Sequence, residues 1–152
     1  MQRMILLVSL VVFAGFAVTA EEADQRVAEE IIAITKAQWA AEKEKNLVEA
    51  MKNVADEYTE FNPNSPVRVD GKALAAQIQE VLATGNTTSV LAEMANEKVQ
   101  VYGNVAILTY NYFGAVKDKS GNIEQTPAKS TRVYAKKNGK WMLVHANFAV
   151  AN

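Results

Sequence analysis

The chain changes character near its middle, from apolar residues at helical spacing to apolar and polar residues in alternation. In the first half, Val27, Ile31 and Ile34 fall on one helical stripe, which Gln38 continues, and charged residues occupy most of the remaining surface. Asn46 is typical of a helix start and separates this pattern from the next. Helices are predicted over residues 23–45, 47–54 and 72–82, with a short strand over residues 57–62.

The second half has the alternation of β-strands, interrupted by turn residues such as Gly103-Asn104 and Gly121-Asn122. Strands are predicted within residues 90–101 and over residues 105–116, 123–137 and 140–150. Three helices followed mostly by antiparallel strands predict an α+β domain with the helices on one face of a sheet. Long antiparallel strands that wrap over helices must coil, so we expect a strongly curved antiparallel sheet.

Asn138-Gly139 is the strongest hairpin signal in the chain, because a two-residue type I′ turn needs positive φ at both positions. Counting outward from this turn places Arg132 opposite His145 and Ser130 opposite Asn147. The other face of the same hairpin is apolar. The sequence therefore predicts a polar face on which the only histidine lies beside an arginine.

The strand predicted over residues 105–116 has apolar or aromatic side chains on both faces. Ile107 and Phe113 fall on one face, and Tyr110 and Tyr112 fall on the other. A sheet with one face in water would show polar residues on that face. Since helices cover one side, a second copy of the chain is expected on the other, and we predict a homodimer through the sheet.

The first twenty residues have the features of a secretory signal peptide. Arg3 precedes an uncharged, mostly apolar run that ends in small residues at Ala20, before Glu21-Glu22. This run is shorter than the roughly 20 residues that a membrane-spanning helix needs, which disfavours the alternative of a retained anchor. We expect export to the periplasm or the medium after cleavage behind Ala20, with residues 21–152 forming one domain and no membrane segment.

The charge balance and the missing residue types exclude several classes of function. Sixteen Lys and Arg residues against 17 Asp and Glu residues provide no electrostatic footprint for nucleic acid or anionic membranes. The chain has no cysteine, so it has no disulfide and no thiolate metal site. With one histidine, neither a metal nor another cofactor is expected. The run Glu42-Lys43-Glu44-Lys45 is interpreted as a solvated helix end.

Three local sequences, in this order of elements, carry a family resemblance. They are Val54–Pro63 followed by Gly71-Lys72, then Val101–Ala106, then the closing hairpin of Thr131–Tyr134, Asn138–Trp141 and Val144-His145. Together they resemble the nuclear transport factor 2-like superfamily, also called the SnoaL-like or cystatin-like cone fold. The hairpin is especially similar to the association domain of calcium/calmodulin-dependent protein kinase II and its bacterial stand-alone relatives. The resemblance implies a cone-shaped domain with a pocket between helices and sheet, and commonly a dimer.

The resemblance also implies residue roles, and this chain departs from most of them. Ketosteroid isomerase-like members use an aspartate before the proline of the first strand, where this chain has Asn62, which cannot act as a base. Their tyrosine acid aligns near Gln38-Trp39 and is missing. Relatives often carry a second histidine two residues after the one that matches His145, where this chain has Asn147. Of the arginines that line the pocket in association-domain relatives, only Arg132 matches.

The expected function is that of an exported, non-catalytic binding or assembly module that holds a small polar or weakly anionic organic molecule. Arg132 is expected to fix the anion, and aromatic side chains are expected to enclose the apolar part. The expected ligand-binding residues are Arg132, His145, Asn147, Tyr112, Trp39, Tyr58 and Phe61. The alternative is a dehydratase- or isomerase-type enzyme acting on a small organic substrate. Arg132 and His145 also fit a purely structural cross-strand pair.

Overall fold

The computed structural model describes residues 19–151, so the predicted signal peptide lies outside the described residues except for Thr19 and Ala20. This part of the chain contains three helices and seven strands, which confirms the predicted α+β class. No helix in residues 19–151 is long and apolar enough to cross a membrane.

The three helices are α1 (Ala20–Lys43), α2 (Leu47–Ala50) and α3 (Lys72–Ala83). Thr19 caps α1, because its hydroxyl accepts a hydrogen bond from the Glu22 N–H while the Glu22 carboxylate accepts one from the Thr19 N–H. Ile31 and Thr35 are fully buried, so the predicted apolar stripe is the side of α1 that packs on the sheet.

The seven strands are β1 (Val54–Phe61), β2 (Val69–Asp70), β3 (Thr88–Tyr102), β4 (Val105–Lys117), β5 (Ile123–Gln125), β6 (Ala128–Lys137) and β7 (Lys140–Val150). They form one sheet in the order β2-β1-β7-β6-β4-β3, with β5 paired to β4 outside this path. The prediction of an entirely antiparallel sheet is wrong at one pair, because β1 and β7 are parallel. A parallel pair needs a long crossover connection, which α3 and the intervening strands provide here.

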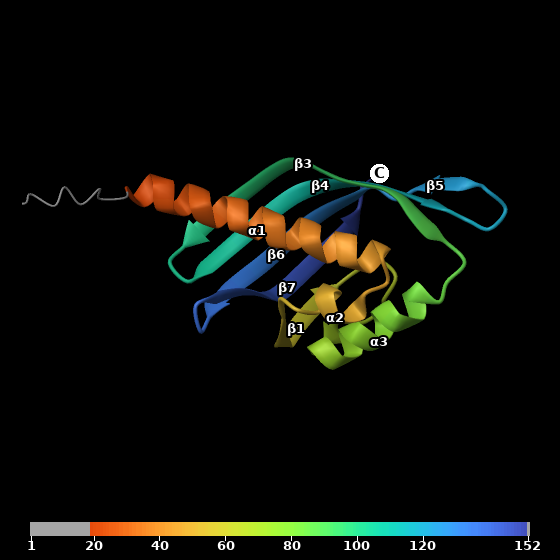
Figure 1. The fold of residues 1–152 in the computed structure, drawn as a ribbon, viewed down its shortest axis with the longest axis horizontal. Helices are drawn as coiled ribbons and strands as arrows, with labels where there is room; N and C mark the ends of the chain where they lie inside the picture. Colours follow the sequence, from red (N-terminus) through yellow and green to blue (C-terminus); the bar gives the residue numbers. More distant parts are fainter. Residues whose placement is uncertain (1–18, 152) are drawn as a thin grey trace, which may run out of the picture.

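The sheet is curved and open, and α1 runs diagonally across one of its faces, while α2 and α3 lie beside β1 (Figure 1). We call the face that carries the helices the inner face and the opposite one the outer face. The largest fully buried side chains include Trp141, Tyr134 and Leu108, all on the inner face of the central strands. The core therefore lies between α1 and the strands β4, β6 and β7.

Two predicted boundaries are wrong for identifiable reasons. The second helix ends at Ala50 rather than Val54, because the Asn53 carbonyl already accepts a hydrogen bond from the Leu143 N–H of β7 at 2.7 Å. Residues 123–137 form two strands rather than one, because Pro127 has no N–H for a ladder. At this break the Thr126 N–H donates instead to the carbonyl of Gly114.

Candidate functional site

The hairpin of β6 and β7 follows the predicted register near its turn and departs from it further out. Tyr134 pairs with Leu143, as expected from the turn. A β-bulge then adds Val144 to β7, so that Arg132 pairs with Ala146. Two residues of one strand face one of the other at such a bulge, and the alternation beyond it is reversed.

This bulge separates side chains that the sequence predicted to converge. The predicted pairs of Arg132 with His145 and of Ser130 with Asn147 are both wrong, because each β7 partner is displaced by one position. Arg132 and Ser130 remain on the inner face, where they are 4% and 5% exposed. The Ser130 hydroxyl is buried without a hydrogen-bond partner among the described residues.

Arg132 is the centre of a hydrogen-bonded network on the inner face. Its Nε donates to the Tyr110 hydroxyl at 3.0 Å, and its Nη1 donates to Oε1 of Gln38 at 2.8 Å. The Gln38 amide in turn donates from Nε2 to the Glu42 carboxylate at 2.9 Å. The guanidinium also lies over the Phe148 ring, 5.4 Å from its centroid. The network therefore connects α1 to β4 and β6 through polar groups.

Glu60 brings a second carboxyl group to the inner face. Its Oε2 accepts a hydrogen bond from the Tyr58 hydroxyl at 2.6 Å, and its Oε1 accepts one from the Asn62 amide at 2.5 Å. Asn62 stands where the resemblance implies a base, and here it serves as a donor to Glu60. Residues 19–151 contain no group of three or more His, Asp or Glu side chains that could hold a metal ion.

Burial and neighbouring charges shift the pKa values of several groups on the inner face. Burial raises the pKa of Glu42, although the Arg132 guanidinium and the Gln38 hydrogen bond act in the opposite direction. Burial and the neighbouring Glu60 carboxylate raise the pKa of Tyr58. Burial by itself lowers the pKa of Arg132, but Tyr110, Tyr134 and Glu42 outweigh it, so this pKa is raised overall. Arg132 is therefore a permanent cation, and Glu42 holds its proton more tightly than a solvated glutamate.

Trp39 and two tyrosines form an aromatic wall beside this network. The Trp39 ring centroid lies 5.6 Å from that of Tyr110 and 5.2 Å from that of Tyr112, where the rings meet edge to face. Burial and the nearby Glu42 raise the pKa of Tyr112. Of the predicted site residues, Trp39, Tyr58, Tyr112 and Arg132 thus belong to the inner face.

The other three predicted site residues belong to the outer face. His145 Nδ1 lies 2.8 Å from the Thr59 hydroxyl, and its ring meets the half-exposed Phe61 ring edge-on at 6.1 Å. Asn147 lines a separate outer hollow of about 340 Å³, whose walls are mainly Asn and Thr side chains. The sheet therefore divides the predicted site into two parts that cannot contact one ligand together.

The network also contains residues that the sequence pattern did not single out as site residues. Gln38 had a signal, because it is a polar residue in the apolar stripe of α1. Glu42 follows one turn later, and its interpretation as part of a solvated helix end is wrong, because it is partly buried and bonded to Gln38. Tyr110 shares a strand face with Tyr112 in the sequence pattern, and Glu60, which lies beside the network, had only its alternation with Tyr58 as a signal.

Comparisons with known proteins agree with this architecture. Residues 27–150 match the family described as the calcium/calmodulin dependent protein kinase II association domain. The association domain of C. elegans CaMKII is 18% identical with a TM-score of 0.71, and the match covers 85% of this chain and 99% of that chain. An NTF2-like protein of unknown function from Pseudomonas putida KT2440 is 16% identical with a TM-score of 0.70, over 82% of this chain and 87% of that one.

An NTF2-like superfamily protein from Salmonella enterica serovar Typhimurium LT2 is 17% identical with a TM-score of 0.70, over 84% of this chain and 93% of that one. No curated protein matches the sequence. Identities of this size establish the shared fold alone, whereas the family match spans most of the chain. The chain belongs to the calcium/calmodulin-dependent protein kinase II association domain family.

Proposed function

We propose that this protein is a non-catalytic assembly module that forms a homodimer through the outer face of its sheet. The apolar character of that face carries the proposal. On β4, Val105 is 38% exposed and Phe113 is 48% exposed. Ile107 of β4 and its partner Val133 of β6 are only partly buried. The described helices pack on the inner face, so a second copy is the simplest cover for these side chains.

The distribution of polar groups on the outer face also supports an interface. Thr109, Thr131 and Asn147 are aligned across β4, β6 and β7, and they form a polar row that runs between Ile107 and Phe113. A typical protein interface carries direct hydrogen bonds as well as apolar contacts, and this row offers donors and acceptors for them. The name "association domain", shared by the matching family and the C. elegans structure, points in the same direction.

Single charged substitutions on the outer face test the dimer. Val105→Lys and Phe113→Lys, made separately, should shift the protein from dimer to monomer in sedimentation velocity experiments at about 50 µM, above ordinary dimer dissociation constants. Both side chains are part-exposed in the monomer, so the fold should survive. Val48→Lys is the matched control, because Val48 is 79% exposed on α2, away from the sheet. A monomeric unmodified protein at this concentration contradicts the proposal.

A second candidate function, binding of a small polar or weakly anionic molecule, is supported by one detail of Arg132. Nε and Nη1 are occupied by Tyr110 and Gln38, but Nη2 has no hydrogen-bond partner within residues 19–151. A guanidinium edge is well suited to a carboxylate. Glu42 and Glu60 lie near enough to disfavour a highly charged anion.

Titration calorimetry with acetate and succinate tests this candidate. Arg132→Lys keeps the positive charge and removes the fork of N–H donors, so it should weaken acetate binding about tenfold. Acetate should bind better than succinate, because succinate carries a second charge toward the Glu42 and Glu60 carboxyl groups. Equal acetate affinities for the two proteins would rule out Arg132 as the anion-binding group.

The alternative of a dehydratase- or isomerase-type enzyme has less support from the geometry. Glu60 already accepts two hydrogen bonds, from Tyr58 and Asn62, and His145 lies across the sheet from the network. A β,γ-unsaturated ketone offered as substrate should therefore isomerise no faster with protein than with buffer. Turnover that disappears in Glu60→Gln would instead establish the enzyme.

A further inference from the structure

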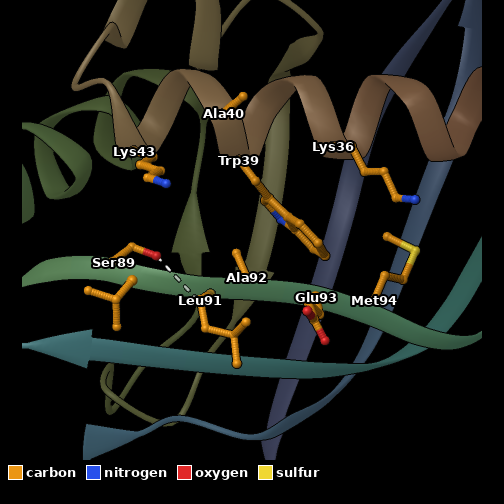
Figure 2. A pocket seen from close by; sticks show the side chains of 10 residues that line it. Lys36, Trp39, Ala40, Lys43, Ser89, Leu91, Ala92, Glu93 and Met94 are labelled. Atoms are coloured by element: carbon orange, nitrogen blue, oxygen red, sulfur yellow. Dashed lines mark hydrogen bonds between the residues drawn. The ribbon is translucent and has the colours of Figure 1, made fainter. Parts of the chain in front are cut away.

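Trp39, beside the Arg132 network, also lines a groove. None of the residues hydrogen-bonded in that network lines this groove. This groove lies between α1 and the edge strand β3 and has a volume of about 450 Å³, within the usual range for small-molecule sites. From α1 it is lined by Lys36, Trp39, Ala40 and Lys43, and from the strand by residues 89–94. Figure 2 shows the Trp39 ring extending from α1 toward β3, beside Ala92.

The groove is hollow because the positions on β3 and β4 beside Trp39 at this point carry little or no side chain. Ala92 contributes one methyl group, and it pairs with Gly114 on β4, which has no side chain. A Cβ at Gly114 would collide with the Tyr112 ring, so this position cannot fill the space with a larger residue. Apolar surface from Trp39, Ala92 and Met94 is consequently left around an open volume.

The two charges that α1 brings to the groove are both positive. Lys36 and Lys43 flank Trp39 in Figure 2, and they are seven positions apart, which is roughly 10 Å along α1. Neither amine forms an ion pair with another described residue. Glu93 is the carboxylate among the lining residues, and its side chain points away from α1. An anionic group at either end of the groove would therefore meet an unpaired ammonium group.

We propose that this groove binds an amphipathic carboxylate, with its apolar part against Trp39 and Ala92 and its carboxylate at Lys36 or Lys43. The apolar lining provides most of the affinity, and the two amines select an anion over a neutral or cationic molecule of equal length. Because exposed lysines interact weakly, the preference for the anion should be only a few-fold. The residues proposed to contact the ligand, Trp39, Ala92 and the two lysines, lie on the α1 side of β3, and the proposed dimer residue Phe113 lies on the outer face. Occupancy of the groove and dimerisation are therefore measured separately.

Three eight-carbon probes separate charge from chain: octanoate, octanol and octylamine. The two tryptophans give separate indole N–H signals in a proton–nitrogen NMR spectrum, and Trp141 is the internal reference because it is 1% exposed. The Trp39→Phe variant lacks one of the two indole signals and so assigns them. Octanoate should shift the Trp39 signal and leave the Trp141 signal in place. Octanoate should bind about threefold tighter than octanol, and octylamine should bind more weakly than either.

Two variants then assign the parts of the site. Ala92→Leu fills the hollow and should weaken octanoate and octanol alike, by about tenfold. Lys36→Gln combined with Lys43→Gln should bring octanoate to the affinity of octanol without changing that of octanol. Ala73→Leu, on the exposed side of α3, is the control for an added isobutyl group and should change neither affinity. The unchanged Trp141 signal checks folding in each variant.

Three results would overturn the proposal. One is octylamine binding as well as octanoate, which would indicate an occupant of different charge. Another is an octanoate preference that survives the double lysine substitution. The third is a Trp39 signal that no probe shifts in the unmodified protein. None of these results depends on the oligomeric state, which sedimentation measures separately.

Discussion

Arg132 joins three elements of the inner face while it is almost fully buried, so its removal should be costly. Arg132→Ala leaves the Tyr110 and Gln38 groups without their donor and Glu42 without a nearby cation. We expect a loss of about 3 kcal/mol in the free energy of unfolding, measured by urea titration. Arg68→Ala is the control, since its ion pair with Asp70 is exposed, and it should cost below about 1 kcal/mol. Equal losses would contradict a structural role for the network.

Glu42 predicts a pH-dependent stability of defined sign. Its folded pKa is raised by burial, so the folded protein binds this proton more tightly than the unfolded chain. The resulting cost is absent below the unfolded pKa of about 4.3 and fully present above the folded pKa. Glu42→Gln, which keeps an acceptor for Gln38, should therefore increase the free energy of unfolding at pH 7 but not at pH 4.

Urea titrations at the two pH values measure this difference. Glu30→Gln, on the exposed side of the same helix, is the matched control and should change neither value. A gain of equal size at pH 4 and pH 7 would show that the proton of Glu42 is not responsible.

At this scale the sequence predicts side-chain chemistry better than side-chain position. Register counting from the Asn138-Gly139 turn is correct as far as Leu143. Beyond it, Val144 and His145 both tolerate either face of a sheet, so nothing in their alternation marks the inserted residue. The position of Arg132 on the inner face was therefore predictable, whereas the position of His145 on the outer face was not.

Among the elements, the start of α1 bears on the proposed export. Thr19 caps this helix, but residues 19–26 are all exposed, so the first two turns bury no core side chain. Cleavage after Ala20 would remove the cap at a cost of about 1 kcal/mol, confined to these turns. We predict that the exported protein begins at Glu21 and that its amides up to residue 26 exchange hydrogen faster than those around Ile31.

N-terminal sequencing and hydrogen exchange measure the two parts of this prediction. Ala20→Leu removes the small residue at the cleavage site and should leave the precursor uncut, whereas Ala23→Leu should be processed normally. An exported, membrane-retained protein that begins at Met1 would contradict cleavage.

The number and kind of elements were predictable because periodicity reports which face of each element is buried. The pairing of the strands was less predictable, because periodicity says nothing about which strands become neighbours. The parallel pair of β1 and β7 joins segments about ninety residues apart, and no local pattern near Val54 or Leu143 encodes it. The break between β5 and β6 at Pro127 could have been predicted, since a proline inside a predicted strand argues against a continuous strand.

For the whole molecule, the proposed dimer predicts that stability depends on concentration. Association that only the folded chain can form raises the midpoint of thermal unfolding as protein concentration rises. We expect the Tm of the unmodified protein to increase between about 1 µM and 100 µM, in differential scanning fluorimetry, as mass action requires. Phe113→Lys should have a Tm that does not change over this range, while Val48→Lys should behave as the unmodified protein. A constant Tm for all three would contradict dimerisation.

The last strand in the chain, β7, occupies a central place in the sheet, between β1 and β6. It also supplies Trp141, Leu143 and Ala146 to the core. A chain that lacks its C-terminal strand therefore has an open gap in the sheet, and distant pairings such as this one form slowly. The sheet cannot be completed until β7 is available for pairing. For a protein that we propose to be exported, late completion of the sheet would favour a chain that is still unfolded during translocation.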